Sequence, residues 1–286
     1  MKRVLLAAAA ATLVFGLHAE GLHVEERVDL SMTSRIRQEA FNHSQVMTLL
    51  GHLTEQIGPR LTNSPAMAQA NDWTRSKFNE WGLANVHDEA MTDAFGRGWE
   101  FRSASVELLS PRAFPLRALP KAWTPGTNGP VEGDAVAAKI ESKADFEKFK
   151  GKLKGKIVFI SEARPYKPGE KPDWHRETDE SLGEMRGLAV PVDQTDAARE
   201  EARERRRKRF EFTPLLNKFL VDEGALATVS QSGWDNGIVL LSGGGSRKAG
   251  ESVGVPALAM SAEHYNSVMR TLERKEPVRM RVNVDA

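Results

Sequence analysis

The chain has 286 residues, of which 40% are hydrophobic and 28% are charged, and its formal net charge is +1. These values are typical of one large or two modest globular domains and argue against wholesale disorder. The near-neutral charge gives no general reason to expect nucleic acid or an anionic membrane as a partner. The absence of cysteine excludes disulfides, thiolate zinc sites and cysteine nucleophiles, so a metal site would need His, Asp and Glu.

The first residues are typical of a secretion signal. Lys2 and Arg3 precede an apolar run from Val4 to Leu17, and the small residue Ala19 follows it. We predict a signal peptide over residues 1–19 and a secreted or periplasmic protein. The alternative is an uncleaved membrane anchor, but the run is short for a membrane span. No later stretch is long and apolar enough, so we expect no stable membrane span after cleavage.

The next part of the sequence predicts two helices. Apolar residues recur at helical spacing from Ser34 to Ile57, which predicts an amphipathic helix with Ser34 as its N-cap. Gly58-Pro59 ends this helix, and a loop follows. Ser64-Pro65 begins the second helix, because Ser is a favoured cap and Pro a favoured first helical residue. Gly82 ends the second helix.

Short strands and helices follow in alternation. We predict strands over residues 85–91, 103–109, 131–140, 156–161, 227–230, 255–260 and 278–284. Helices are predicted over residues 142–149, 212–223 and 261–273. Pro and Gly are frequent between residues 111 and 130, where we place a domain boundary. A long polar segment at residues 162–210 includes a very charged helix over residues 193–210.

Two stretches together resemble one protein family. The first is IGPRLTNSP at residues 57–65, followed by NDWTRSKFNEWGLANVHDE. It is similar to the opening of peptidase M28 zinc exopeptidases, where a Gly-Pro-Arg-Leu-Thr-Gly-Ser loop joins two helices. Asn63 replaces the usual glycine, and because Asn tolerates a left-handed backbone, the loop is expected to keep its shape. The second stretch is GKIVFI with the closing VGVPALAMSAEHYNSVMRTLERKEPVRMRVNVDA, which resembles a protease-associated (PA) domain.

The resemblance implies an α/β fold in two parts. The first is a partial zinc-exopeptidase-type domain, with helices and the first strands, at residues 32–112. The second is a mixed β/α PA domain at residues 113–284, with the charged helical insertion at about residues 162–210. In the family, the catalytic part resumes after the PA insert and holds two zinc ions through a His-x-Asp motif, further carboxylates and a final His. The sequence contains neither His-x-Asp nor His-Glu-x-x-His and stops at Ala286, so we expect no catalytic, cofactor-binding or metal-ligating residue in it.

The histidines after residue 19 are candidate metal ligands; they are His23, His43, His52, His87, His175 and His264. His43 and His52 lie nine residues apart on the predicted first helix and so face different directions. His87 and Glu89 could form half a metal site on one side of a strand, but a polar strand edge is favoured. A solvated loop is favoured over a metal site at His175. A surface role is expected for His264.

Other motifs give little support for catalysis or phosphate binding. Ser232, within SQSGW, does not match the Gly-x-Ser-x-Gly nucleophile elbow. The SGGGS run at residues 242–246 lacks the Lys-Ser/Thr of a phosphate loop and is interpreted as a flexible turn. The RRRKR run at residues 205–209 could indicate nucleic acid or a processing site, but upstream acids and the lack of an aromatic platform favour a solvated helical face. Trp123 is expected to pack at the domain junction.

The favoured function is that of the N-terminal portion of a secreted M28-like zinc metallopeptidase, inactive alone. A complete relative would hydrolyse a peptide bond next to a chain terminus. Its expected partners are a peptide or protein substrate and a missing C-terminal catalytic segment, with no nucleic acid. The alternative is a secreted PA-domain module that binds peptide or protein without catalysis. An active hydrolase of unfamiliar type is a third possibility.

Overall fold

The computed structural model describes residues 28–90, 95–165, 174–186 and 196–286. The chain forms two compact units, Met1–Gln56 and Ile57–Ala286, and each is described by itself. The predicted signal peptide over residues 1–19 lies outside the described residues, as does His23. No helix in the described part is both long enough and apolar enough to cross a membrane.

The first helix begins earlier than its sequence pattern predicted. Helix α2 spans Leu30–Asn42, and its N-cap is Asp29. The Asp29 carboxylate accepts hydrogen bonds from the backbone N–H groups of Ser31 and Met32, at 2.9 and 3.0 Å. The prediction of Ser34 as the N-cap was therefore wrong, because Asp29 satisfies the free N–H groups of the first turn one turn earlier.

The predicted single helix over residues 34–57 is interrupted. Helix α2 ends at Asn42, and α3 begins only at Val46 and runs to Gly51. A π-helix, η1, then continues over His52–Ile57. The break falls at His43, Ser44 and Gln45. The hydroxyl of Ser44 accepts a hydrogen bond from the N–H of Val46 and so competes with the helix for a backbone donor. Hydrophobic spacing alone does not detect such a break.

Helix α4, over Pro65–Glu80, confirms the predicted loop and second helix. The hydroxyl of Ser64 accepts a hydrogen bond from the N–H of Met67 at 3.1 Å, and a proline occupies the first turn. Asn63 has a φ of 62°, the left-handed conformation expected where the family has glycine. Gly82, with a φ of 77°, follows the helix and ends it.

The predicted strand over residues 85–91 is not formed in its described part. Residues 86–90 are irregular, and residue 91 lies outside the described residues. Asn85 has a φ of 57°, which turns the chain out of an extended conformation. The segment pairs with no strand in the part of the chain that the structure describes, so its backbone has no ladder to join.

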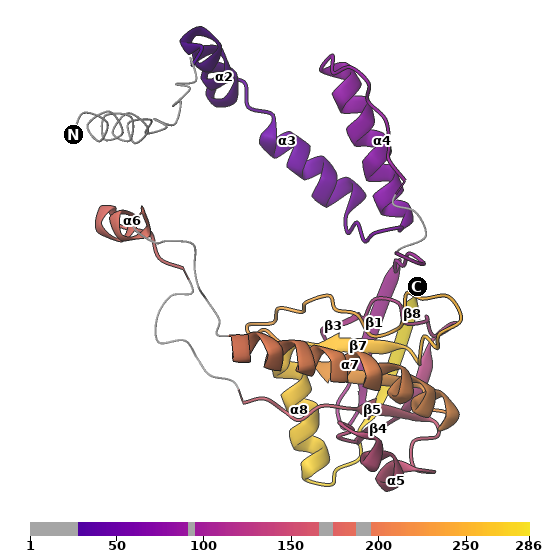
Figure 1. The fold of residues 1–286 in the computed structure, drawn as a ribbon. Coiled ribbons are helices and arrows are strands. Elements are labelled where there is room, and N and C mark those ends of the chain that lie inside the picture. The colour runs from indigo at the N-terminus through magenta and orange to yellow at the C-terminus, as the bar shows by residue number, and fades with distance from the viewer. Residues whose placement is uncertain (1–27, 91–94, 166–173, 187–195) are drawn as a thin grey trace, which may run out of the picture. The chain divides into compact units, whose positions relative to one another are not determined.

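The second unit contains one mixed sheet of eight strands, labelled in Figure 1 where space allows. The strands are β1 (Ser103–Ser110), β2 (Phe114–Pro115), β3 (Ala118–Pro120), β4 (Val131–Ala137), β5 (Lys156–Phe159), β6 (Ala227–Gln231), β7 (Ala257–Met260) and β8 (Arg279–Asp285). Their order is β2-β1-β8-β4-β5-β6-β7-β3. Strands β4 to β7 are parallel neighbours, and the other pairs are antiparallel. The predicted α/β class is confirmed.

The sheet curls because residues 114–120 form the strands at both of its edges. Strands β2 and β3 are first and last in that order, yet only Leu116 and Arg117 separate them along the chain. The N–H of Leu116 donates to Val106 O at 2.8 Å, and the N–H of Ser261 donates to Arg117 O at 2.9 Å. Strand β1, which the sequence placed in the first domain, thus shares a sheet with strands placed in the second. The boundary between residues 112 and 113 stays a prediction.

Side chains of the central strands alternate between two buried clusters. Ile157 and Phe159 of β5 enter a cluster that includes Tyr265 and Val268 of α8 (Ala262–Glu273). Val158, between them, enters the second cluster. The continuous apolar run of β5 is therefore buried on both faces, as predicted for a central parallel strand.

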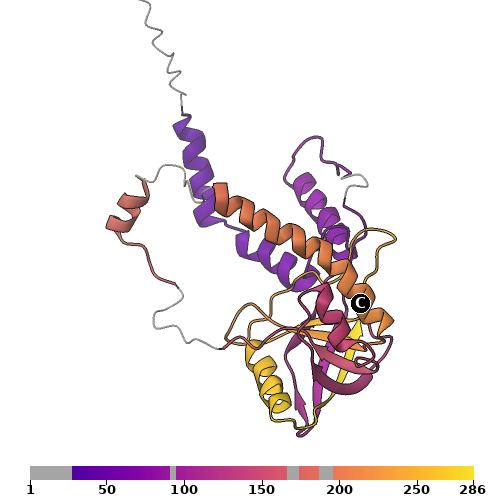
Figure 2. The same ribbon diagram turned by 60° about the horizontal axis from the view of Figure 1, so that its bottom comes forward.

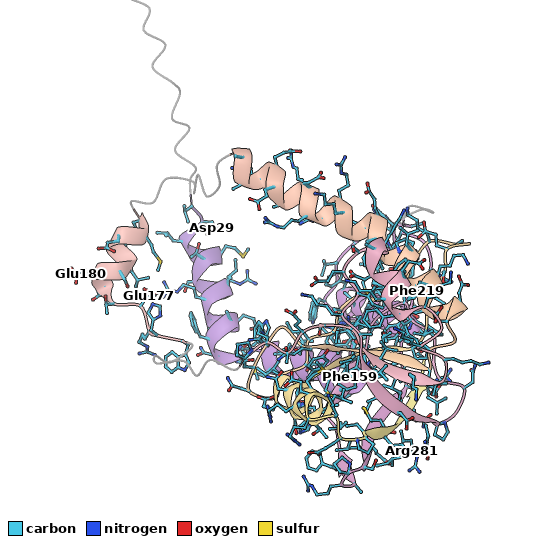
Figure 3. All side chains as sticks on the ribbon, turned by 90° about the horizontal axis from the view of Figure 1, so that it is seen from below. Asp29, Phe159, Glu177, Glu180, Phe219 and Arg281 are labelled. Carbon is cyan, nitrogen blue, oxygen red and sulfur yellow. The ribbon has the colours of Figure 1, made fainter. Side chains whose placement is uncertain are left out.

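Helices α5 (Phe146–Phe149) and α7 (Asp196–Asp222) cover the second cluster (Figure 2). The ring of Phe219 on α7 stacks on Phe146 at a centroid distance of 4.3 Å, and Figure 3 labels Phe219 and Phe159. The short helix before α5, η3 (Lys143–Asp145), has the predicted cap, Ser142, in a capping box with Asp145. Helix α6 (Asp179–Arg186) belongs to the charged segment.

Helix α7 joins the two helices predicted over residues 193–210 and 212–223. Its first half is held by acid–base pairs at four-residue spacing, such as Glu204 with Lys208 at 3.6 Å. Its second half packs through Phe212 and Leu216 on the second cluster. Pro214 lies inside the helix and removes one N–H, but both flanking halves are independently stabilised, so the helix continues.

We predict that Phe159→Ala lowers the free energy of unfolding by about 3–5 kcal/mol, because it empties a fully buried position. Urea denaturation measures this loss. Phe210→Ala is the matched control, since Phe210 is 71% exposed on α7 and should change stability by less than about 0.5 kcal/mol. Equal losses in the two variants would contradict the core described here.

Candidate functional site

Histidine–carboxylate pairs are present, but they do not gather into a metal centre. No cluster of three or more His, Asp and Glu side chains suited to a metal ion occurs among the described residues. His43 Nδ1 lies 3.0 Å from Glu39, and His175 Nε2 lies 2.8 Å from Glu177. His52 lies in η1. Each pair supplies two of the three or four protein ligands that zinc requires.

His87 and Glu89 lie on the same side of the chain, with 3.4 Å between Nε2 and Oε1. They do so on an irregular segment, whereas the sequence predicted a strand. Asp88, which lies between them, forms an ion pair with Arg75 of α4. The nearest additional carboxylate is therefore engaged elsewhere.

Ser232 is buried, and its hydroxyl forms hydrogen bonds that hold a loop in place. Its side chain donates to Ile238 O at 2.9 Å and accepts from the N–H of Leu240 at 3.4 Å. The residue is only 3% exposed. These bonds close the loop after β6, and the described structure gives the hydroxyl no adjacent histidine base that would make it a nucleophile.

A polar network at the carboxyl ends of the parallel strands was missed by the sequence interpretation. The hydroxyl of Tyr265 donates to Ser161 O at 2.6 Å, just after β5. Gln231, at the end of β6, accepts from the N–H of Arg164 at 2.6 Å and donates to Asn266 at 3.2 Å. Burial raises the pKa of the Tyr265 hydroxyl. Polar residues directly after buried strands, as in SEAR after KIVFI, were the available signal.

This network is suited to holding loops. The Arg164 guanidinium binds the Asp235 carboxylate at 2.8 Å, so the loops after β5 and β6 are tied together. Ligands often bind at this edge of α/β sheets. Here, however, no buried side-chain polar atom of the described residues lacks a partner. The polar groups therefore satisfy one another rather than face an open site.

Residues 95–99, FGRGW, form a segment here named the strap, which contacts the loop of the M28-like motif. The side-chain N–H of Asn63 donates to Gly96 O at 2.7 Å. A Cβ atom added at Gly98 would overlap the carbonyl oxygen of Asn63. The strap and the motif loop are therefore in backbone contact, which only glycine at this position permits.

The strap also contacts the loops that contain Trp123, Thr124 and Ser246. The Arg97 guanidinium donates twice to Ser246 O, at 2.6 and 3.0 Å. Trp123 Nε1 donates to Arg97 O at 3.1 Å, and Trp99 Nε1 donates to Thr124 O at 2.9 Å. Trp123, expected at a domain junction, is thus a contact of the strap.

The SGGGS run at residues 242–246 is packed closely, which corrects its interpretation as a flexible turn. Gly243 forms a β-bridge with Ala122, and the N–H of Gly244 donates to Ala122 O at 3.0 Å. A Cβ atom at Gly245 would overlap the carbonyl oxygen of Trp123. The glycines allow two backbones to meet, which local composition does not distinguish from flexibility.

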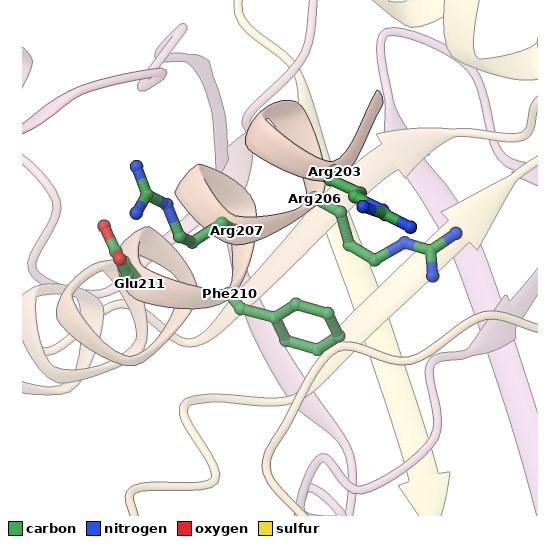
Figure 4. Close-up of a pocket in the computed structure, with 5 residues that line it drawn as sticks. All are labelled: Arg203, Arg206, Arg207, Phe210 and Glu211. Carbon is green, nitrogen blue, oxygen red and sulfur yellow. The ribbon is translucent and has the colours of Figure 1, made fainter. Parts of the chain in front are cut away.

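The RRRKR run lies on α7 beside a shallow hollow of about 430 Å³ (Figure 4). The lining residues are Arg203, Arg206, Arg207, Phe210 and Glu211. All five come from one helix, so they cannot surround a ligand. The side chains of residues 205–208 are exposed, and Arg205 pairs with Glu201. The predicted solvated helical face is confirmed for these four side chains.

His264 of α8 is half-buried, which the expectation of a surface role did not foresee. Its Nδ1 accepts a hydrogen bond from the N–H of Arg117 at 2.7 Å, and its ring meets Phe114 edge-on at a centroid distance of 5.2 Å. Burial lowers the pKa of His264; Glu263 raises that pKa and Arg117 lowers it further. The backbone N–H of Arg117 can only donate, so Nδ1 accepts, and the proton of the neutral imidazole lies on Nε2.

Comparison with known proteins gives similarity to solved structures. No protein-family model and no curated protein sequence matches the chain. The structure is similar to a peptidase M28 precursor from Shewanella amazonensis, with a TM-score of 0.48 and 20% identity over 89% of this chain and 50% of that one. It is also similar to a zinc aminopeptidase from Bacillus subtilis, with a TM-score of 0.42 and 14% identity over 84% of this chain and 42% of that one. A third similar structure is an aminopeptidase from Aneurinibacillus, with a TM-score of 0.39 and 12% identity over 87% of this chain and 46% of that one. The chain spans half the length of the first structure and less of the others.

We predict that Gly98→Ala loosens the strap, because the added methyl group must displace the backbone of Asn63. The expected loss in the free energy of unfolding is about 1–3 kcal/mol. Faster amide hydrogen exchange is expected at Arg97, whose N–H donates to Arg247 O. Gly233→Ala is the matched control, because an added Cβ there meets no atom within 4 Å. Unchanged exchange at Arg97 would refute the close contact.

The lowered pKa of His264 predicts a loss of stability in mild acid. The unfolded chain binds this proton more readily, so stability should fall as the pH drops below the ordinary histidine pKa of about 6.5. His264→Gln keeps an acceptor for Arg117 but does not titrate. Melting temperatures measured between pH 7 and pH 5 should decline less in this variant. The idea fails if both proteins show the same pH dependence.

Proposed function

We propose that this chain supplies two parts of a secreted M28-like zinc exopeptidase: the front helices, which are α2, α3, η1 and α4, and the sheet unit, which is the eight-stranded sheet with its helices. The role of this chain is to support the enzyme's structure and to shape the access of substrate. In such an enzyme the sheet unit takes the place of the PA insert. The chemistry of peptide hydrolysis would come from zinc ligands outside the residues described here.

The strap is the observation that supports this proposal. The stretches that carry the resemblance lie far apart in the sequence: the M28-like opening at residues 57–89, and the PA-like GKIVFI at residues 155–160 with the closing residues 253–286. The strap binds the first stretch through Asn63. It also binds the loop just before the closing residues, through Arg97 and Ser246. A direct mechanical link between a helix–loop–helix opening and a sheet unit is what an inserted access module requires.

The described residues do not fit a dinuclear zinc centre. Such a centre needs converging imidazoles and carboxylates, with a bridging carboxylate and a general base. Instead, His43, His87 and His175 each pair with a single carboxylate, and His264 accepts a hydrogen bond from the backbone N–H of Arg117. We therefore place no catalytic step on any residue of this chain.

Exposed apolar side chains on the front helices favour this proposal over a free-standing module. Leu30, Phe41 and Met47 are 77%, 80% and 74% exposed. All three lie on α2 and α3. Where exposed apolar side chains form a contiguous patch, they mark a surface that other protein covers. The alternative, a PA-type module that binds peptide without catalysis, is favoured by one feature: both core clusters lie within residues 104–284, so the sheet unit can close its own core.

Two measurements test the proposal. The purified chain should retain no stoichiometric zinc in elemental analysis and should not hydrolyse an aminoacyl-p-nitroanilide with zinc added. Native secreted material that carries this sequence should hydrolyse the same substrate, and an antibody to the sheet unit should deplete that activity. Chelator-sensitive hydrolysis by the purified chain would contradict the assigned role. Native activity that the antibody leaves untouched would contradict the link to a peptidase.

We further predict that the purified chain self-associates, because the apolar side chains of α2 and α3 are uncovered. Size-exclusion chromatography with light scattering should show species larger than the monomer. The triple variant Leu30→Lys, Phe41→Lys and Met47→Lys should return the chain to a monomer, since all three side chains are exposed. A wild-type chain that is monomeric at high concentration would instead favour the free-standing binding module.

A further inference from the structure

A recess between the β1–β2 turn and helix α8 combines an apolar floor with a basic rim. Its volume is about 180 Å³. Its lining residues are Leu108, Pro111, Arg112, Phe114, Leu116, His264, Ser267, Val268, Thr271 and Val278. We refer to it as the His264 recess.

The His264 recess is suited to a single apolar group. Pockets for drug-sized ligands usually measure about 300–1,000 Å³, so a recess of about 180 Å³ has room for one side chain. Its floor is formed by aliphatic residues such as Leu108, Val268 and Val278 together with the ring of Phe114. Filling this floor with an apolar side chain would remove apolar surface from water on both partners.

The rim of the recess can bind an anionic group. The guanidinium of Arg112 lies 5.0 Å from the centre of the Phe114 ring, which is part of the floor. Within the described part of the chain, no carboxylate forms an ion pair with Arg112. His264 commits Nδ1 to Arg117, which leaves its Nε2–H as the remaining donor.

The neighbouring acids do not neutralise this rim. Glu263, beside His264, accepts a hydrogen bond from the N–H of Gly237 at 3.0 Å. Glu276, beyond the end of α8, is paired with Arg274 at 2.7 Å. A ligand carboxylate would therefore meet two donors, the Arg112 guanidinium and the His264 Nε2–H, without a competing acid in the lining.

We propose that the His264 recess binds the C-terminal residue of a peptide, with its apolar side chain on the floor and its free carboxylate at Arg112. The basic group lies directly over one wall of the apolar floor, so the ligand must carry its carboxylate and its apolar group on adjacent atoms. A C-terminal amino acid does so, because both groups are attached to one Cα. A straight-chain fatty acid extends its chain away from the carboxylate and exceeds the recess. This binding site does not depend on the proposed peptidase function.

Titration of the isotope-labelled full chain with N-acetyl-Gly-Gly-Leu, followed by NMR, tests the proposal. Saturable shifts are expected at residues 108–116 and 264–271. The same peptide with a C-terminal amide should bind about tenfold more weakly, because a charge-assisted hydrogen bond is lost. Arg112→Gln should weaken binding of the acid to a similar extent and leave binding of the amide almost unchanged.

Two further variants separate binding from folding. Ser267→Trp places a bulky ring in the recess from an exposed position on α8 and should abolish the shifts while the rest of the spectrum is preserved. Arg270→Gln is the matched control for Arg112→Gln, because Arg270 is an exposed arginine of α8 outside the lining, and it should bind like wild type. Absence of shifts, equal binding of acid and amide, or equally tight binding of hexanoate would overturn the proposal.

Discussion

The contact between the strap and two other stretches of backbone is the constraint on which the second unit depends. Gly98 of the strap meets the carbonyl of Asn63, and, outside the strap, Gly245 meets the carbonyl of Trp123, each at a distance that excludes a side chain. Arg97 then fixes the strap by bonding Ser246 O with its guanidinium. The arrangement therefore requires glycine where two backbones meet, and it also requires the donor side chains of Asn63, Arg97, Trp99 and Trp123.

The curled sheet depends on a second backbone constraint. Residues 114–120 must pair with β1 at one end and with β7 at the other, so the strands between them have to close around the first core cluster. The paired strands fix the position of Arg117, and its N–H fixes the tautomer of His264. The same chain segment thus builds the sheet, one wall of the recess and the orientation of its histidine.

Local sequence signals predicted the elements whose stability is local or strongly patterned. Ser64-Pro65 identified a helix start, KIVFI a strand buried on both faces, and residues 278–284 an alternating strand. The signals failed where distant partners decide the structure. Strands β2 and β3 have only two and three residues, too few for a periodic pattern. The break after Asn42 reflects side-chain competition for the backbone, which hydrophobic spacing does not record.

In the candidate site, too, the sequence indicated local pairs of residues but not the contacts with distant residues. The sequence indicated that His87 and Glu89 could share one side of a strand. The two side chains do lie 3.4 Å apart, but on an irregular segment, and the sequence could not show that Asp88 is engaged by Arg75. The pKa of His264 is lowered chiefly by burial and further by Arg117, groups that only the folded chain brings together. The buried side-chain polar atoms of the described residues all have partners, and a fully satisfied polar network makes a structure more rigid. The basic rim and the apolar floor of the His264 recess are therefore the part of this unit that is suited to bind a ligand.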